Sequence, residues 1–397
     1  MRKPASPEQS DSTAGRVDDQ ARPLLEVRGL TVQYLGERPV TACADVDLDL
    51  HRGEILGVAG ESGSGKSTLI TALTRLQRPP AATTGGQILL HDQGRSVDLV
   101  ALAEDELRRY RWNTVSIVLQ SAMDALNPVM RLGAQFADVI GEHDRSIGSQ
   151  DVFDRTIELL AMVGIPANRV RSYPHELSGG MRQRAMIALA LACRPKLVVM
   201  DEPTTAVDVV MQRQIVRQIL RLRQELGFAV VFVTHDLSLL LELADRIAIM
   251  YAGRIVEIGS AAQIYHQPRH PYTRGLRDSF PPLHAELTKL TGIPGTPPNL
   301  NRLPAGCAFA PRCSEAFDAC TDRRPELRSL GDQQAACHLH DPGRLGAAPS
   351  HRVQPFDDQP SLPGPAALSF PVRKSRVRES PRLSVRRDDD HRRPRCP

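Results

Sequence analysis

A glycine-rich segment carries the residue types that bind phosphate groups. It follows the apolar run 55–59 and precedes a predicted helix, which is the context that a phosphate-binding loop requires. Glycines let the backbone curl so that successive N–H groups point at phosphate oxygens, and the helix adds the positive end of its dipole. We expect Lys66 to bridge the β- and γ-phosphates of a nucleotide and the Ser67 hydroxyl to hold Mg²⁺. The segment consists of Gly60, Glu61, Ser62, Gly63, Ser64, Gly65, Lys66, Ser67 and Thr68.

An acidic pair follows a second buried strand. The apolar run 197–200 ends in Asp201 and Glu202. Taken alone, such a pair is as often an ordinary solvated loop as a site. With the phosphate loop upstream, however, Asp201 is a suitable Mg²⁺ partner, and Glu202 is suitably placed to orient or deprotonate an attacking water. Together the two segments predict nucleotide hydrolysis.

Strand and helix patterns alternate along the chain. Alternating or continuously apolar stretches predict strands, and helical periodicity separates several of them. This order indicates an α/β core with a β-rich subdomain near its start. The predicted strands are 25–27, 30–32, 44–50, 55–59, 197–200, 229–233 and 247–250, and the predicted helices are 102–111, 152–163, 181–192 and 209–226.

Charge and hydropathy exclude several classes of function. The net charge of +4 divides into +6 for residues 371–397 and −2 for the rest, so a basic body suited to nucleic acid is absent. The longest apolar runs fall far short of the roughly 18 residues of a membrane-spanning helix. The polar N-terminus has no signal-peptide core, so we expect a cytoplasmic protein. The basic tail could contact anionic lipid headgroups, but its lack of amphipathic pattern favours a solvated tail without a partner.

The segment 177–184, Leu-Ser-Gly-Gly-Met-Arg-Gln-Arg, resembles the signature motif of ABC ATPases. Its place between the phosphate loop and Asp201 is also that of the family. The resemblance implies an ABC-type P-loop ATPase core with an antiparallel β subdomain and a helical signature subdomain. It also implies that Ser178, Gly179 and Gly180 contact the γ-phosphate of an ATP bound by a second subunit, which suits a helix N-terminus with small residues.

Four further positions match this family in order. Gln120 matches the glutamine that senses the metal and water and couples to membrane subunits, and Asp208 matches the D-loop aspartate, although Val207 stands where the family usually has Leu. His235 matches the switch histidine at the γ-phosphate; alone it would be read as a core histidine. Tyr34 is placed like the residue that stacks on adenine, but Tyr is also a common strand residue. The resemblance thus implies ATP as ligand, Lys66, Gln120, Glu202 and His235 as the catalytic set, and Ser67, Gln120 and Asp201 as Mg²⁺ ligands.

Motifs outside the shared core narrow the resemblance to oligopeptide, dipeptide and nickel importer ATPases, over roughly residues 24–340. This subfamily implies three kinds of partner: a second ATPase subunit, two permeases and an extracytoplasmic substrate-binding protein. It suggests that the second ATPase subunit is a paralogue, and it places the chain on the cytoplasmic face of the membrane as a peripheral protein.

Nickel or another small solute stays an alternative cargo to peptides. A soluble ABC ATPase is disfavoured because no long coiled coil or second cassette is present, and an exporter ATPase or a catalytically silent partner remain further alternatives. The motifs are at 125–128, 173–176, 270–276, 293–298 and 306–313.

Four cysteines gather in one short stretch, with five, six and sixteen residues between successive members. In a reducing compartment such a cluster indicates a metal site more than a disulfide framework. Four thiolates suit a [4Fe–4S] cluster or tetrahedral Zn²⁺, while the close C-x-x-C pairs usual for zinc are absent. The family resemblance favours the iron–sulfur cluster over Zn²⁺ or metal-free thiols, in a structural role. The cysteines are Cys307, Cys313, Cys320 and Cys337.

These observations predict four regions along the chain. The expected regions are a disordered leader at 1–22, an ABC ATPase domain at 23–276 with its helical subdomain at about 121–185, a C-terminal four-cysteine module at 277–341, and a disordered basic Pro/Arg-rich tail at 342–397.

Overall fold

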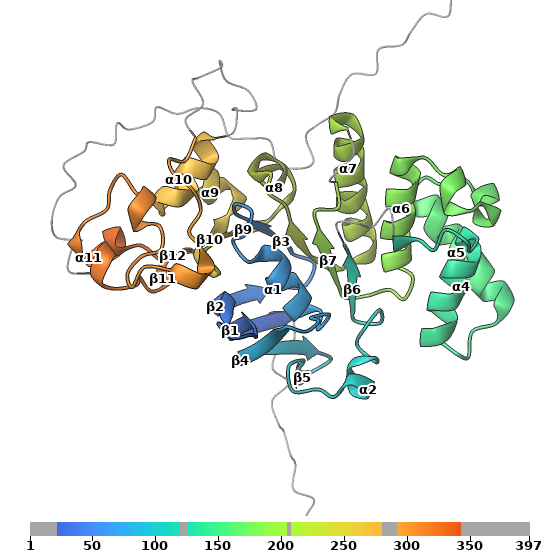
Figure 1. Cartoon of the computed structure of the whole chain (residues 1–397). Coiled ribbons are helices and arrows are strands. Elements are labelled where there is room, and N and C mark those ends of the chain that lie inside the picture. Colours follow the sequence, from blue (N-terminus) through green and yellow to red (C-terminus); the bar gives the residue numbers. More distant parts are fainter. Residues whose placement is uncertain (1–21, 120–124, 205–207, 280–291, 343–397) are drawn as a thin grey trace, which may run out of the picture. The chain divides into compact units, whose positions relative to one another are not determined.

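The computed structural model describes residues 22–119, 125–204, 208–279 and 292–342. Most of the predicted leader and tail, and Gln120, lie outside the described residues. Within them the strands form a four-stranded sheet, ordered β2-β1-β4-β5, and an eight-stranded sheet, ordered β11-β12-β10-β9-β3-β8-β7-β6 (Figure 1). The strands are β1 (Leu25–Tyr34), β2 (Val40–Leu50), β3 (Ile55–Ala59), β4 (Ala81–Asp92), β5 (Arg95–Asp98), β6 (Val115–Val118), β7 (Leu197–Asp201), β8 (Ala229–Val233), β9 (Arg246–Tyr251), β10 (Arg254–Ser260), β11 (Arg328–Leu330) and β12 (Gln333–Ala335).

The eight-stranded sheet has a parallel part and an antiparallel part. Strands β6, β7, β8, β3 and β9 pair in parallel, and β10, β12 and β11 continue the sheet antiparallel. Because parallel strands end at the same edge, the register sets Asp201 of β7 and Val58 of β3 both beside Val233 of β8. The phosphate loop, the acidic pair and His235 therefore leave the sheet along one edge.

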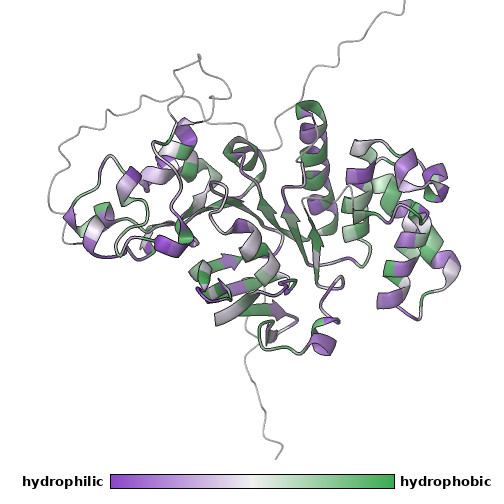
Figure 2. Ribbon diagram, in the orientation of Figure 1, coloured by the Kyte–Doolittle hydropathy of each residue, from purple (hydrophilic) through white to green (hydrophobic). Residues whose placement is uncertain are grey.

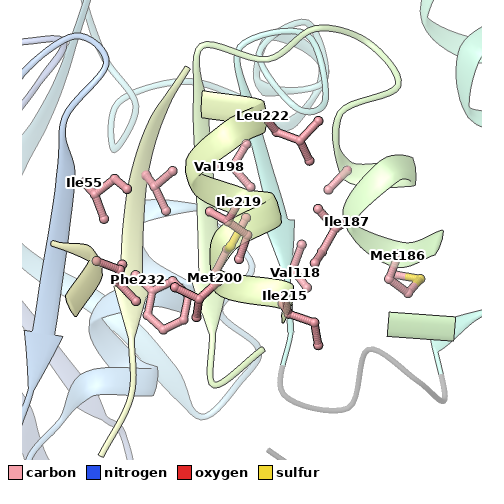
Figure 3. Packing of buried hydrophobic residues seen from close by; sticks show 14 of the residues in the cluster. Ile55, Val118, Met186, Ile187, Val198, Met200, Ile215, Ile219, Leu222 and Phe232 are labelled. Carbon is pink, nitrogen blue, oxygen red and sulfur yellow. The ribbon is translucent and has the colours of Figure 1, made fainter. Parts of the chain in front are cut away.

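Both faces of the parallel strands are buried. Along β7, Val198 and Met200 face a core shared with α6 and α7, whereas Leu197 and Val199 belong to a second core shared with the four-stranded sheet. Figure 3 shows the first of these cores, with residues of β3, β6, β7 and β8 packed against the two helices. Alternate side chains of a strand point to opposite faces, so a strand covered on both sides needs apolar residues throughout. The continuous apolar runs in the sequence follow from this arrangement.

The helix α7 covers the sheet with one apolar stripe. Its buried residues Ile215, Ile219 and Leu222 recur at the spacing of a single helix face, and Figure 2 shows the opposite side coloured hydrophilic. Asp208 caps its first turn, and Gly227 ends it with φ 74°. The α-helices are α1 (Lys66–Leu73), α2 (Glu104–Leu107), α4 (Leu132–His143), α5 (Ser149–Met162), α6 (Gly179–Ala190), α7 (Val209–Leu226), α8 (Leu237–Leu243), α9 (Ala261–His266), α10 (Pro271–Asp278) and α11 (Asp318–Asp322).

The four-stranded sheet confirms the predicted antiparallel β part. Strand β1 pairs antiparallel with β2 on one side and with β4 on the other. Its residues Leu25, Val27, Leu30 and Val32 are buried in the second core, and the alternation is interrupted by a register shift between Val27 and Leu30. The glycine pair near the middle of these strands fits closely, because a Cβ on Gly86 would lie 2.5 Å from the Gly29 carbonyl oxygen. The predicted α/β core with an antiparallel part is therefore present.

The sequence predictions differ from the structure in several places. The helix predicted over 102–111 is reduced to α2, because the chain turns to enter β6 and Trp112 takes a left-handed backbone (φ 63°) that no α-helix contains. Strands β4, β5, β6, β10, β11 and β12 were not predicted; β12 pairs with β10, from Glu257 opposite Ala335. None of the helices in the described part of the chain is long and apolar enough to span a bilayer.

Candidate nucleotide-binding site

The phosphate loop fills the turn between β3 and α1. Gly60 has φ 154°, and a Cβ there would lie 2.2 Å from the carbonyl oxygen of Met250 in the neighbouring strand β9. Gly65 caps α1 with φ 103°, and a Cβ there would lie 2.3 Å from the Ala42 carbonyl oxygen. Side chains at these two positions would collide with backbone that cannot move aside. The loop therefore lies directly on β2 and β9.

Lys66 is buried at the start of α1, inside the curve of the loop. Its Nζ donates to the carbonyl oxygens of Gly60 (2.8 Å) and Glu61 (2.9 Å). Burial lowers the pKa of Lys66, while the nearby carboxylates of Glu202, Asp201 and Glu61 raise it. The ammonium group thus has three acidic neighbours and makes two hydrogen bonds to neutral carbonyl oxygens, both strengthened by its own positive charge.

Asp201 ends β7 beside the first turn of α1. A side-chain hydrogen bond joins its carboxylate to Ser67. Burial and the adjacent Glu202 carboxylate raise the pKa of Asp201, against the opposing effects of Ser67 and Lys66. The carboxylate pair is therefore electrostatically costly, and a cation bound between Asp201 and Ser67 would relieve that cost.

Glu202 and His235 meet beyond the ends of β7 and β8. Nδ1 of His235 lies 3.1 Å from Oε1 of Glu202, a distance at which a protonated Nδ1 donates to the carboxylate. Glu202 takes a left-handed backbone (φ 45°) and its N–H donates to the Val233 carbonyl oxygen at 2.8 Å. Such a conformation costs on the order of 1 kcal/mol in a non-glycine residue, so the strand hydrogen bond is needed to maintain it. Glu202 has 16% of its side chain exposed and His235 has 66%, so the histidine is the one that an incoming molecule meets first.

Tyr34 lies at the end of β1 near the phosphate loop. Its Oη is 3.2 Å from Oγ1 of Thr68 on α1, and the residue is 41% exposed. The ring is therefore accessible next to the loop, while its hydroxyl group is held at α1.

The signature residues lie at the N-terminus of α6. The Ser178 Oγ accepts the Met181 N–H at 3.3 Å and so caps the helix. A Cβ on Gly180 would lie 2.7 Å from the Met211 sulfur, which shows how closely α6 packs on α7. In the described contacts these residues bond within α6 and pack on α7, whereas Lys66, Asp201, Glu202 and His235 gather at the sheet edge. Gly179 begins α6, and Asp208 caps α7 by accepting the Met211 N–H at 2.9 Å.

The second residue of the loop contacts a part of the chain that the motifs did not connect to it. Arg312 donates Nη1 and Nη2 to the two carboxylate oxygens of Glu61, at 2.6 and 2.9 Å. The Glu61 N–H donates to Oη of Tyr272 at 2.9 Å. Both partners lie in segments that were connected in the sequence only to the family resemblance. The Glu61 carboxylate within the phosphate loop is the feature of the sequence that would have indicated a cation nearby.

A cavity of about 390 Å³ opens at the same place. Its walls combine the start of the phosphate loop and His235 with α10 and the segment that follows it. Its lining residues are Gly60, Glu61, Ser62, His235, Leu276, Ser279, Ile293 and Pro297.

The four cysteines surround one small cavity of about 10 Å³, near the least volume that holds a water molecule. His270 and His338 also line it. Burial raises the pKa of the Cys337 thiol to about 12 and also raises those of Cys307 and Cys313, so these thiols stay protonated unless a cation is bound. Across the described residues, no group of three or more His, Cys, Asp or Glu is placed to hold a metal ion. The predicted metal centre is therefore not confirmed.

His270 caps the helix α10 and so accounts for the local structure of the His-Pro-Tyr segment. Its ring is buried and its Nδ1 accepts the Tyr272 N–H at 3.0 Å, which caps α10, while Pro271 takes the first helical position where no N–H is needed. Burial lowers the pKa of His270 to about 3, so the ring is neutral at physiological pH and can act as this acceptor.

Two family models match the chain. The model described as "ABC transporter" matches residues 43–205, and the model described as "Oligopeptide/dipeptide transporter, C-terminal region" matches residues 256–320. The first range contains the phosphate loop, the signature segment and the acidic pair. The second contains the His-Pro-Tyr segment, Arg312 and three of the four cysteines.

Relatives match over most of the chain. A protein of Brucella ovis named for peptide import ATP binding is 44% identical over 79% of this chain and 96% of its own length. The oligopeptide transport ATP-binding protein OppD of Salmonella typhimurium is 42% identical over 79% of this chain and 92% of its own. The dipeptide transport ATP-binding protein DppD of Caldanaerobacter subterraneus is 38% identical, covering 81% and 98%.

A solved structure matches the ATP-binding part. It is an ATP-binding cassette, determined as a dimer in a post-hydrolysis state with ADP and Pi bound. Its sequence is 27% identical with a TM-score of 0.53, and the match covers 60% of this chain and 98% of that one.

The close approach of Gly60 to β9 can be tested by Gly60→Ala. Because the added Cβ would lie 2.2 Å from the Met250 carbonyl oxygen, the loop must shift away from the sheet. We expect the affinity for ATP to fall at least about tenfold, or ~1.4 kcal/mol, in a titration of the full-length chain with a fluorescent ATP analogue.

The matched control is Gly141→Ala on α4, where a Cβ meets nothing within 4 Å. This change should leave ATP affinity as it is and raise helix stability by ~0.5–1 kcal/mol. Wild-type affinity in Gly60→Ala would show that the loop tolerates displacement.

Proposed function

This chain belongs to the family of ATP-binding proteins of oligopeptide and dipeptide ABC transporters, and we propose that it hydrolyses ATP to drive uptake of di- or oligopeptides. The ABC ATPase fold and the ATPase activity that the sequence predicts follow from this membership. The observation that carries the proposal is the convergence of Lys66, Asp201, Glu202 and His235 at one edge of the sheet.

The residues at this edge have complementary tasks. Lys66 leaves the carbonyls of Gly60 and Glu61 to contact the β- and γ-phosphates of ATP, together with the loop N–H groups from Ser62 to Thr68. Glu202 orients or deprotonates the attacking water, and His235 donates to the γ-phosphate. The 3.1 Å contact between Glu202 and His235 supports this pairing of roles.

The side-chain oxygens of Asp201 and Ser67 suit Mg²⁺. Their side chains are hydrogen-bonded, and burial together with the adjacent Glu202 carboxylate raises the pKa of Asp201. Oxygen ligands of this type are those that Mg²⁺ prefers. Ser67 and Asp201, with Gln120 from outside the described residues, would hold the ion, which supplies positive charge against the phosphates.

The chain supplies half of each of two sites. It has one phosphate loop and one signature segment, and we assign Ser178, Gly179 and Gly180 to the ATP bound by a second subunit. The dimeric state of the solved cassette, which holds ADP and Pi, supports a two-subunit arrangement. Tyr34 stacks on adenine, Asp208 belongs to the subunit contact, and Gln120 couples the site to the membrane partners.

The remaining partners follow from the peptide-import names of the relatives. We assign the chain to the cytoplasmic face of the membrane, bound to two permeases and supplied by an extracytoplasmic substrate-binding protein. The second ATPase subunit is a paralogue. The proposed regions remain 23–276 for the ATPase domain, with a helical subdomain at about 121–185, and 277–341 for the four-cysteine module.

We also propose that Cys307, Cys313, Cys320 and Cys337 hold a [4Fe–4S] cluster, with Zn²⁺ as the alternative. All four line one cavity, and four thiols are a suitable donor set for either group. The cavity as described is too small for a cluster, so binding would require its walls to move apart while the four sulfurs still point into it. The group would stabilise this part of the chain.

Glu202→Gln tests the hydrolytic role. The amide keeps the size of the side chain but can no longer take a proton from water, so we expect turnover to fall by roughly 10²–10⁴-fold while ATP still binds. ATPase assays and light scattering of the assembled ATPase pair should show an ATP-loaded closed dimer with little hydrolysis.

Glu242→Gln, an exposed position on α8, is the matched control and should hydrolyse ATP at the wild-type rate. Normal steady-state hydrolysis by Glu202→Gln would contradict the assignment of Glu202.

The cargo is tested in vesicles that contain the chain with its permeases, the second ATPase subunit and the binding protein. We expect ATP-dependent uptake of labelled di- or oligopeptides, falling to background in Lys66→Ala. Uptake of nickel ions without uptake of peptides would overturn the peptide proposal and favour the metal alternative.

The cysteine proposal is tested by anaerobic purification of the full chain. About four iron and four sulfide per chain, with the absorption and paramagnetic resonance of a cluster, are expected. Cys320→Ala should lower the iron content, whereas Cys193→Ala, outside the cysteine cavity, should not. One equivalent of zinc, or metal-free thiols, would contradict the cluster.

A further inference from the structure

We propose that Arg312 and Tyr272 position the start of the phosphate loop through Glu61 and thereby set the affinity of the site for ATP. This inference rests on the ATP-binding role proposed for the loop and adds two positioning residues from outside the nucleotide motifs. Neither residue needs to touch ATP, because both act through Glu61.

Arg312 holds the Glu61 side chain in a fixed geometry. Its two terminal nitrogens donate to the two carboxylate oxygens at 2.6 and 2.9 Å, and its Nε donates to the Pro294 carbonyl oxygen at 2.7 Å. Only 6% of the Arg312 side chain is exposed, against 24% for Glu61. A planar guanidinium bound on both edges fixes its partner in position as well as in charge, which a lysine could not do.

Tyr272 holds the Glu61 backbone. The Glu61 N–H donates to Oη of Tyr272 at 2.9 Å, and Tyr272 is fully buried. The same peptide unit contains the Gly60 carbonyl, which points the opposite way in a planar trans peptide. That carbonyl accepts Nζ of Lys66 at 2.8 Å. By fixing the N–H, Tyr272 therefore also fixes the carbonyl that holds the phosphate-binding lysine.

The two positioning residues are themselves immobilised by aromatic packing. The rings of Tyr251 and Tyr272 lie 4.5 Å apart between centroids, and Phe309 meets Tyr251 edge-on at 5.3 Å. The Arg312 guanidinium lies 5.9 Å from the centroids of both Tyr251 and Phe309. All three rings are buried, so this support is rigid.

A loop held in this way is pre-organised for phosphate. Its N–H groups need not be ordered when ATP binds, so the ordering cost does not reduce affinity. The benefit applies equally to bound ATP and to the transition state, since Glu61 is held before either forms. Loss of the support should therefore raise the KM for ATP more than it lowers kcat.

The experiment is a double-mutant cycle on full-length protein. Arg312→Gln and Glu61→Gln should each weaken ATP-analogue binding and raise the KM of the assembled ATPase about tenfold, with kcat changed less than about threefold. Because the pair acts as a unit, the double variant should bind no more weakly than Arg312→Gln alone. Arg312→Lys should fall between wild type and Arg312→Gln.

Tyr272→Phe tests the backbone contact separately. It keeps the buried ring but removes Oη, and it should weaken ATP binding about threefold without loss of folding. Arg323→Gln is the control: it removes an ion pair with Asp341, 2.6 Å long in the same part of the chain, that does not contact the loop. It should leave the KM for ATP unchanged.

The outcomes separate this inference from the proposed function. Folded Arg312→Gln and Tyr272→Phe proteins with wild-type ATP affinity would overturn the inference, as would additive effects of Arg312→Gln and Glu61→Gln. If Lys66→Ala also bound ATP normally, the loop would not be the ATP site and the proposed function would fail. If Lys66→Ala lost ATP while Arg312→Gln did not, only the positioning role would be wrong.

Discussion

The parallel strands of the large sheet are buried on both faces, and the phosphate loop, the acidic pair and His235 take their positions from the ends of these strands. Strand β3 has no exposed residue, and its neighbours β8 and β9 are covered by a core on each side. A register slip of one residue would move each apolar side chain to the opposite core. Because the register is fixed so firmly, the strand ends that carry Gly60, Asp201 and His235 keep their relative places.

This rigid edge supports an arrangement of charge that is unfavourable by itself. Lys66 is buried among three carboxylates, and Asp201 has its pKa raised by burial and by Glu202. Glu202 keeps a left-handed backbone held by a strand hydrogen bond. Local strain and crowded charge of this kind are maintained only where the surroundings over-determine them. The two buried cores provide that support, and ATP with its metal ion would rebalance the charge.

Local patterns in the sequence were sufficient for much of this. The apolar run before the glycine-rich loop predicted β3 and α1, and the period of α7 predicted its bounds at 209–226, as observed. Other features, such as strand β12 and the turn at Trp112, depend on contacts between distant residues and could not be predicted in this way. Strand β12 is short and contains Gln333 and Gln334, so only pairing with β10 makes it a strand. The turn at Trp112, which shortens the predicted helix 102–111, is likewise imposed by the entry into β6.

The bond between Glu61 and Arg312 joins residues 251 positions apart. This bond limits which parts of two related proteins can be joined in a chimera. A chimera that takes its first half from one cassette and its C-terminal segment from another exchanges one member of this pair without the other. Positions 61 and 312 should therefore come from the same parent protein, so that the chimera keeps the contact that holds its phosphate loop.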